Sequence, residues 1–306
     1  MTLVATVSTV GARPDAVALL PREPGVYRFR DERGRVLYVG RAADLRSRVG
    51  SYWGALRDRR HLRRMVPQIV GIEALVFASD HEAAWAERML LEHRLARWNR
   101  VRGGMESPLY VRVDTTLPGI TTAHEVVEAP GVRWYGPYLG GTATRLGVAG
   151  LERVHPLSYA RARLTGTERD LGRIHGVDAS DASSLVAAID LALQRDPESA
   201  LATRSALVAK REQAASSELY EVASRISDEL GGFDWLVAPV RLFAADGRVT
   251  GAASGHRVSL TFGQGRLRTW EQAPSETDTM DAPQDWHDFL RTNATLAAAL
   301  YAHPVG

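Results

Sequence analysis

The sequence predicts an α+β fold: a small domain with a three-stranded antiparallel sheet flanked by helices, followed by a mixed helical and β C-terminal part. Two strand-like runs, 25–29 and 35–39, are separated by turn residues at 31–34. A third run, 69–77, is rich in branched apolar residues, and an amphipathic helical pattern occupies 81–98. We therefore expect a hairpin, a third strand and a packed helix early in the chain.

Composition sets the broad class. A chain of 306 residues with 45% hydrophobic and 24% charged residues can bury a core large enough for two domains. The absence of cysteine excludes disulfides, thiolate zinc sites and cysteine-ligated iron–sulfur clusters. No apolar run approaches the ~20 residues of a membrane span, and the N-terminus does not resemble a secretion signal. We expect a cytoplasmic protein without a membrane partner.

The charge is distributed unevenly along the chain. Through Val113 the sequence holds 20 arginines against 12 acidic residues, a net +8, whereas the remainder holds 18 basic and 24 acidic residues, a net −6. Arginine suits bidentate contacts with phosphate, so the first third is the part expected to meet a polyanion. Five arginines are crowded together: Arg57, Arg59, Arg60, Arg63 and Arg64. A solvated helical face and a phosphate-binding face both fit this cluster.

The first helices are short. The segment 1–20 is expected to be a lead-in with one or two helical turns after residue 13. Asp44 is a suitable N-cap for a helix that runs to about Trp53. Leu45, Val49 and Tyr52 share one face of that helix, and Arg48 borders it.

The predicted helix at 81–98 carries a carboxylate beside its apolar stripe. The stripe consists of Ala84, Leu91, Leu95 and Trp98. Glu87 falls at the edge of the stripe, while Glu82 and Glu92 point elsewhere. Burying an unpaired carboxylate costs several kcal/mol, so Glu87 should lie beside a cation, a metal ion or strong hydrogen-bond donors. A structural salt bridge and a functional role are both open for it.

The rest of the chain alternates in character. Strand-like pieces at 109–113 and 132–134 precede a helix to about residue 154, and 158–181 looks irregular. Helical composition returns at 183–194 and 200–230, the second of which we expect to be one arm of a helical hairpin. The segment 235–271 has β character with Asp246 and Gly247 as its hairpin signal, and a final helix covers 286–301.

Several short motifs occur together in register. They are Pro24, Gly25, Val26 and Tyr27; Leu37, Tyr38, Val39, Gly40, Arg41 and Ala42; Asp44, Leu45, Arg46, Ser47 and Arg48 with Ser51 and Tyr52; Glu82, Ala83 and Glu87; and Asn99. Each tyrosine alone is typical of a strand core. The combination resembles a GIY-YIG nuclease domain, and more closely the N-terminal domain of UvrC-type excision-repair nucleases. The resemblance is strongest between residue 21 and about residue 110.

Further along, the similarity is thinner. Residues 135–138 resemble the glycine-proline-tyrosine turn of the UvrC family, and 155–157 resemble the segment before its cysteines. Residues 214–228 resemble the helical hairpin through which UvrC-type proteins contact the helicase UvrB. The resemblance therefore implies DNA and a UvrB-type helicase as partners.

The chain also departs from the UvrC pattern. Arg41 replaces the usual lysine, and the cysteine cluster is absent, so no iron–sulfur cluster is expected. There is no room for the second nuclease domain and the DNA-binding hairpin pair, so we expect a shortened relative comparable to the Cho type. The expected domains are a lead-in (1–20), a GIY-YIG nuclease domain (21–102), a linker region without iron–sulfur cysteines (103–182), a UVR-like hairpin (183–232) and a β-rich region with a final helix (233–306).

The resemblance implies a role for each matched residue. It places Tyr27, Tyr38, Arg41, Arg48 and Tyr52 in catalysis. Glu87 would hold Mg²⁺, which Mn²⁺ would replace, and Tyr38 would orient and deprotonate the attacking water with Tyr27 beside it. Arg48 and Tyr52 would place the scissile phosphate, and Arg41 would act electrostatically because arginine cannot give up its proton. The residues expected on DNA are Arg46, Arg57, Arg59, Arg60, Arg63, Arg64 and Asn99.

The implied function is a metal-dependent endonuclease that hydrolyses one phosphodiester bond in damaged or structured DNA during excision repair. The alternative is a catalytically weak DNA-binding or scaffold protein that keeps the domain as a recognition module. Retention of Tyr27, Tyr38, Arg48 and Glu87 favours activity, because a binding module is free to lose the metal ligand. A sequence-specific homing or restriction enzyme is disfavoured by the UvrC-like features after residue 130.

Overall fold

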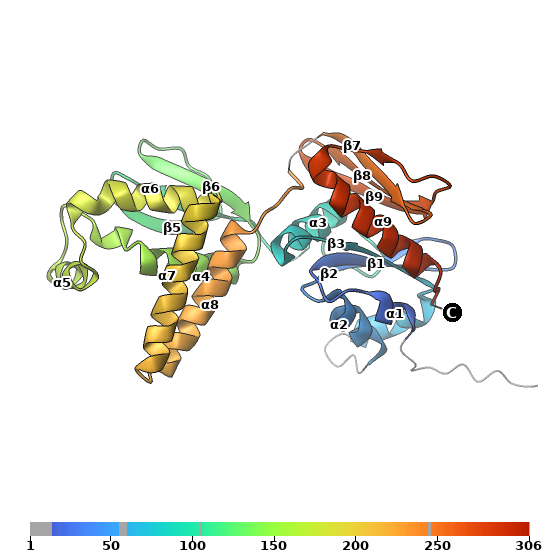
Figure 1. The fold of residues 1–306 in the computed structure, drawn as a ribbon, viewed down its shortest axis with the longest axis horizontal. Helices are drawn as coiled ribbons and strands as arrows, with labels where there is room; N and C mark the ends of the chain where they lie inside the picture. The colour runs from blue at the N-terminus through green and yellow to red at the C-terminus, as the bar shows by residue number, and fades with distance from the viewer. Residues whose placement is uncertain (1–13, 55–59, 105, 244–245, 306) are drawn as a thin grey trace, which may run out of the picture. The chain divides into compact units, whose positions relative to one another are not determined.

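The computed structural model describes residues 14–54, 60–104, 106–243 and 246–305 (Figure 1). The described chain forms two compact units. The first joins Met1–Met105 to Val240–Gly306, and the second is Glu106–Pro239. Of the predicted lead-in 1–20, residues 1–13 lie outside the described residues. The C-terminal segment that the sequence set apart thus shares a unit with the tyrosine-bearing hairpin.

The first sheet of the first unit consists of β1 (Gly25–Arg30), β2 (Val36–Ala42) and β3 (Gly71–Val76). Its order is β2-β1-β3 and both pairings are antiparallel, which confirms the predicted three-stranded sheet. The turn between β1 and β2 forms because the Asp31 carboxylate accepts the backbone N–H groups of Arg33 and Arg35, and Gly34 adopts a positive φ.

Short helices flank this sheet: α1 (Ala16–Leu19), α2 (Leu45–Gly50) with the 3-10 turn Ser51–Trp53, and α3 (Asp80–His93). The Asp44 side chain accepts the Ser47 N–H at 2.8 Å, so the predicted N-cap is confirmed. The expected helix 81–98 is too long at its C-terminal end, since Arg94 is extended and the chain leaves the helix there. Leu95 consequently lies exposed, while Trp98 still packs on the core.

The C-terminal part of this unit contributes a second antiparallel sheet and a helix. Its strands are β7 (Gly247–Ala253), β8 (His256–Gly263), β9 (Arg266–Pro274) and β10 (Met280–Asp281), in the order β10-β7-β8-β9, followed by α9 (His287–Tyr301). The expected hairpin turn at Asp246–Gly247 is wrong, because Gly247 opens β7. The two turns instead use Ser254–Gly255 and Gln264–Gly265, all four with positive φ.

Helix α9 packs against β3 of the first sheet and against β7 and β8 of the second. Its buried Asn293 forms a backbone-like pair with Val76 at the free edge of β3, accepting the Val76 N–H at 2.7 Å and donating to its carbonyl at 3.2 Å. Asn99 does the same at the other edge, accepting the Val39 N–H at 2.9 Å and donating to its carbonyl at 2.8 Å. Both outer strands of the sheet are therefore capped by an asparagine amide.

The second unit also combines a sheet with helices. Its strands are β4 (Leu109–Asp114), β5 (Gly119–Ala123) and β6 (Val132–Tyr138), in the order β5-β4-β6, and its helices are α4 (Gly141–Val154), α5 (Gly166–His175), α6 (Ala182–Leu193), α7 (Pro197–Ser216) and α8 (Tyr220–Val237). Residues 135–138, expected as a turn, belong to β6.

Two further sequence expectations for the second unit are wrong. The segment 158–181 is not wholly irregular, because α5 forms there with a capping box between Thr165 and Glu168. The stretch 200–230 is not one arm of a hairpin but both of its arms. The helix breaks at 217–219, where Glu218 has φ 60, and α8 returns along α7. Within the described residues, no helix is long and apolar enough to cross a membrane.

Candidate active site

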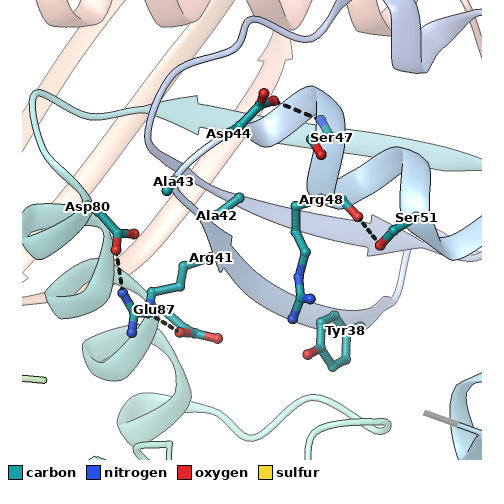
Figure 2. A pocket seen from close by; sticks show the side chains of 10 residues that line it. All are labelled: Tyr38, Arg41, Ala42, Ala43, Asp44, Ser47, Arg48, Ser51, Asp80 and Glu87. Atoms are coloured by element: carbon teal, nitrogen blue, oxygen red, sulfur yellow. Dashed lines mark hydrogen bonds and ion pairs between the residues drawn. The ribbon is translucent and has the colours of Figure 1, made fainter. Parts of the chain in front are cut away.

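An open pocket of about 660 Å³ lies in the first unit where β2, α2 and α3 meet. Figure 2 shows the side chains around it. The pocket is lined by Tyr38, Arg41, Ala42, Ala43, Asp44, Ser47, Arg48, Ser51, Asp80 and Glu87. Four of the residues singled out in the sequence therefore converge here: Tyr38, Arg41, Arg48 and Glu87.

The register of the β1–β2 hairpin explains why Tyr27 and Tyr38 lie close together and why residue 40 is a glycine. Tyr27 on β1 pairs with Gly40 on β2. A Cβ atom at Gly40 would lie 2.6 Å from the Tyr27 hydroxyl oxygen and 2.7 Å from the Tyr38 ring, so no larger residue fits there without displacing a tyrosine. Glycine at this position allows the two rings to approach, with ring centroids 6.3 Å apart.

Tyr27 and Tyr52 lie behind the pocket and not on its surface. Their side chains are 0% and 1% exposed, and their hydroxyl oxygens are 2.7 Å apart. Burial raises the pKa of both tyrosines strongly. Neither lines the pocket, but both neighbour residues that do: the charge of Arg48 lowers the pKa of Tyr27, and the Tyr38 ring centroid is 6.0 Å from that of Tyr52.

Tyr38 is the tyrosine that reaches the pocket, and Arg48 lies beside it (Figure 2). Burial raises the pKa of Tyr38, and the negative charge of Glu87 raises it further, whereas the hydrogen bond with Tyr52 and the charge of Arg48 lower it. The hydroxyl is therefore neutral at neutral pH. A positive charge placed near Glu87 would remove one of the two causes that raise this pKa.

Arg41 lies between two carboxylates of α3. Its Nη1 is 3.0 Å from Asp80 Oδ2, and its Nε is 3.6 Å from Glu87 Oε2 (Figure 2). The three side chains are between 23% and 31% exposed, so each remains open to solvent at the pocket. Sequence reasoning missed Asp80, whose signal was its place in the first turn of α3 next to the Ser79 cap.

The donor set at Glu87 fits a cation that retains most of its water. Among the described residues no three histidines, cysteines or carboxylates form a closed metal cage. Glu87 supplies one carboxylate at the pocket wall, with Asp80 nearby on the same helix. Mg²⁺ is commonly bound by one or two carboxylates with several waters completing its shell, so this open arrangement suits it.

The buried carboxylate of α3 is Glu82, not Glu87. Its side chain is 0% exposed and ion-pairs with Arg241, Oε1 lying 3.2 Å from Nε, while the backbone N–H groups of Arg241 and Ala78 donate to it. The expectation that Glu82 points away from the packed face is wrong, because β9 and the Val240–Gly306 segment cover that face as well. Helical periodicity describes one helix only, so it could not indicate that Glu82 pairs with the distant Arg241.

Four predicted DNA-contacting residues, Arg46, Arg63, Arg64 and Asn99, do not line the pocket. The Asn99 amide is occupied at β2, and Arg46 Nε donates to the Leu20 carbonyl at 2.6 Å. Arg63 and Arg64 are exposed on a short 3-10 helix, Arg60–Arg64. Arg57, Arg59 and the Arg60 side chain lie outside the described residues.

The comparison with protein families agrees with this geometry. Residues 23–100 match the model of the UvrC-like GIY-YIG domain. This part of the chain, with Tyr38, Arg48 and Glu87 around one pocket, is a UvrC-like GIY-YIG domain.

The chain is also related in sequence to UvrABC system protein C. The protein from Trichlorobacter lovleyi is 33% identical over 147 residues, which are 47% of this chain and 24% of that relative. The protein from Thermobifida fusca is 33% identical over 227 residues, 69% of this chain and 34% of the relative. The protein from Frankia casuarinae is 30% identical over 245 residues, which are 74% of this chain and 34% of the relative. The matched region thus spans only about a quarter to a third of these relatives.

Among solved structures, the chain is similar to the GIY-YIG N-terminal endonuclease domain of UvrC from Thermotoga maritima, bound to its catalytic divalent cation, magnesium. The sequence identity is 28%, and the match covers 28% of this chain and 91% of that chain with a TM-score of 0.25.

Proposed function

We propose that this protein is a metal-dependent DNA endonuclease that hydrolyses a single phosphodiester bond in damaged or structured DNA during nucleotide excision repair. The observation that carries the proposal is the convergence of Tyr38, Arg48 and Glu87 on one open pocket, in a segment that matches the UvrC-like GIY-YIG domain. The pocket offers a hydroxyl, a guanidinium and a carboxylate, which are the groups that phosphodiester hydrolysis requires.

Each side chain has a separate task in the proposed reaction. Arg48 binds a nonbridging oxygen of the scissile phosphate, because its fixed charge and forked donors match a phosphate. Tyr38 accepts a hydrogen bond from the attacking water and orients it toward phosphorus. Tyr27 and Tyr52 keep Tyr38 in position from behind. Glu87 would hold a divalent cation, Mg²⁺ or in its place Mn²⁺, since both take oxygen ligands.

The proton of the attacking water must leave as the new P–O bond forms and the bond to the leaving oxygen breaks. A bound cation would supply positive charge that stabilises the charge developing on the phosphate and the leaving oxygen. Tyr38 can take the proton only when its pKa falls from the raised value that burial gives it. Arg48 lowers that pKa, and Arg41 adds a second fixed positive charge to the pocket.

For the partner, we propose that a UvrB-type helicase docks on the hairpin of α7 and α8. The support is the resemblance of 214–228 to the UvrC hairpin, together with apolar side chains exposed at its tip. Leu219 is 55% exposed and Tyr220 is 68% exposed. Exposed apolar groups on a helical tip are suited to docking into a groove of another protein.

The test of the catalytic proposal compares the wild type with Glu87→Ala on damaged duplex, in Mg²⁺ or in EDTA, with and without UvrB. Incision by the wild type in Mg²⁺ alone or with UvrB, and its loss in the variant and in EDTA, is the expected result. Equal incision by the variant would remove Glu87 from the mechanism. Binding of DNA with no incision under any condition would support a recognition module and overturn the enzyme.

A further inference from the structure

A second cleft in the first unit, of about 670 Å³, lies between the β1–β2 hairpin, the segment after α3 and β9. It shares no lining residue with the catalytic pocket. Leu37 and Val39 line the cleft, whereas Tyr38 between them lines the catalytic pocket, as side-chain alternation along β2 requires. Tyr38 therefore points away from the cleft that its two neighbours line.

Positive charge dominates this cleft. Six arginines line it: Arg28, Arg30, Arg35, Arg94, Arg97 and Arg268. Its two acidic lining residues are already paired, Asp31 with Arg35 and Glu271 with Arg248. Within the ranges that the structure describes, no carboxylate forms an ion pair with Arg94, Arg97 or Arg268, and the first two are exposed. The mouth of the cleft therefore carries uncompensated positive charge.

Arg28 forms the inner wall. Its side chain is 7% exposed, and the single carboxylate of Glu73 is shared between Arg28 and Arg30. The Arg28 guanidinium stacks 4.0 Å from the Trp270 ring centroid and donates from Nη1 to the Trp270 carbonyl at 2.6 Å. Its Nη2 and the Trp270 Nε1 are buried donors with no hydrogen-bond partner among the described residues. Burial of this under-neutralised charge is costly, and an anion in the cleft would offset the cost.

The chemistry of the lining points to phosphate groups along a chain. Arginines that are distributed along a cleft suit several phosphates better than one, because each guanidinium group can bind a separate phosphate. The apolar lining, Leu37, Val39, Leu90 and Leu95, suits the sugar and base surfaces between them. The apolar side chains can contact bases only where these are unpaired, so the lining favours a single strand over a duplex.

We propose that this cleft is a second nucleic-acid site, which holds the phosphate backbone of a single strand. This inference rests on the proposed function only in taking DNA as the nucleic acid that binds. Helix α3 connects the two sites: Glu87 lies at the catalytic pocket, and His93, six residues later, lines the cleft. That separation is about 9 Å along the helix axis.

The experiment measures binding of a fluorescently labelled oligothymidylate by anisotropy in EDTA, where no incision occurs. The double variant Arg94→Ala/Arg97→Ala removes two exposed charges of the cleft. Its control, Arg257→Ala/Arg291→Ala, removes two exposed arginines of the same unit outside the cleft. The cleft variant should bind about tenfold more weakly, with a salt slope shallower by about 1.4, since each single-strand phosphate contact contributes about 0.7. The control should bind like the wild type.

Equal weakening in both variants, or in neither, would overturn the proposal. Inorganic phosphate is the competitor that separates a strand site from a site for one anion: displacement of the oligonucleotide by low millimolar phosphate would contradict a strand site. Hydrogen exchange should show protection at 94–97 and 268–271 on binding, and protection elsewhere alone would contradict the location. Glu87→Gln should bind the oligonucleotide normally, so loss of incision and loss of this binding are distinguishable.

Discussion

The hydroxyl oxygens of Tyr27 and Tyr52 lie 2.7 Å apart in the core of the first unit, and neither reaches the pocket that Tyr38 lines. This relationship separates two kinds of tyrosine. Tyr27 and Tyr52 are buried, and of the three tyrosines only Tyr38 lines the pocket.

The first prediction contrasts Tyr27→Phe with Tyr38→Phe. Loss of the Tyr27 hydroxyl removes a hydrogen-bond partner of the buried Tyr52 hydroxyl. Tyr27→Phe should therefore lower the free energy of unfolding by about 1–2 kcal/mol. Tyr38→Phe should lower it less but abolish incision. Urea denaturation and single-turnover incision assays check the two outcomes. A Tyr38→Phe variant with full activity would exclude Tyr38 from catalysis.

A second prediction concerns alkaline stability. Burial holds the pKa of Tyr27, Tyr38 and Tyr52 above the unfolded value of ~10, so these groups stay neutral in the folded state while the unfolded chain ionises. Their contribution to stability is complete below pH ~10 and is lost as the pH rises toward the folded values, by about 1.4 kcal/mol per pH unit for each tyrosine. Urea titrations at several pH values above 9 measure this slope. Tyr27→Phe should reduce it, and an unchanged slope would contradict the assignment.

The third prediction addresses the ion pairs of Arg41. In Asp80→Asn, Arg41 loses its partner at 3.0 Å and its attraction to Glu87 increases. Divalent cations then compete with Arg41 for Glu87, so the Mn²⁺ dissociation constant should rise several-fold, as expected for a change of about 1 kcal/mol. Mn²⁺ binding followed by electron paramagnetic resonance measures this without incision.

A matched control for Asp80→Asn is Glu92→Gln, which lies on the same helix but pairs with Arg88 and Arg266 outside the pocket. It should leave Mn²⁺ affinity unchanged. If both variants weaken Mn²⁺ binding equally, the effect is the general loss of negative charge and not the position of Arg41.

A fourth prediction tests the buried pair of Glu82 and Arg241. Arg241→Ala leaves a fully buried carboxylate without its cation and should destabilise the first unit by about 3 kcal/mol. Burial raises the pKa of Glu82 above its ordinary value, so the loss should grow as the pH rises from acidic values toward neutrality, where the carboxylate ionises.

Adding Glu82→Gln to Arg241→Ala should recover part of that loss, because the amide is neutral and still accepts backbone N–H groups. Thermal unfolding at pH 5 and pH 7 measures both variants. Additive losses in the double variant would show that the two residues do not interact.

Local patterns in the sequence predicted the hairpin, the third strand and α3, because alternation, turn residues and helical periodicity are short-range signals. The resemblance to a known domain further predicted that Tyr38, Arg41, Arg48 and Glu87 lie together, because residues that match the motifs of one domain are expected to share its site. Two other results depended on distant segments. Glu82 pairs with Arg241, and Arg28 donates to the Trp270 carbonyl in addition to its ion pair with Glu73. Periodicity within one helix or strand could not indicate either distant contact.

The two asparagine caps, Asn99 on β2 and Asn293 on β3, limit how this domain can associate with other chains. Uncapped outer strands offer rows of N–H and C=O groups that can accept an added strand from a neighbour, in specific complexes or in aggregates. Here one main-chain pair at each side is already satisfied by a side chain from another segment. At Val39 and Val76 the main chain therefore cannot also pair with an added strand, and replacing either asparagine with alanine would leave one backbone N–H and C=O without these partners.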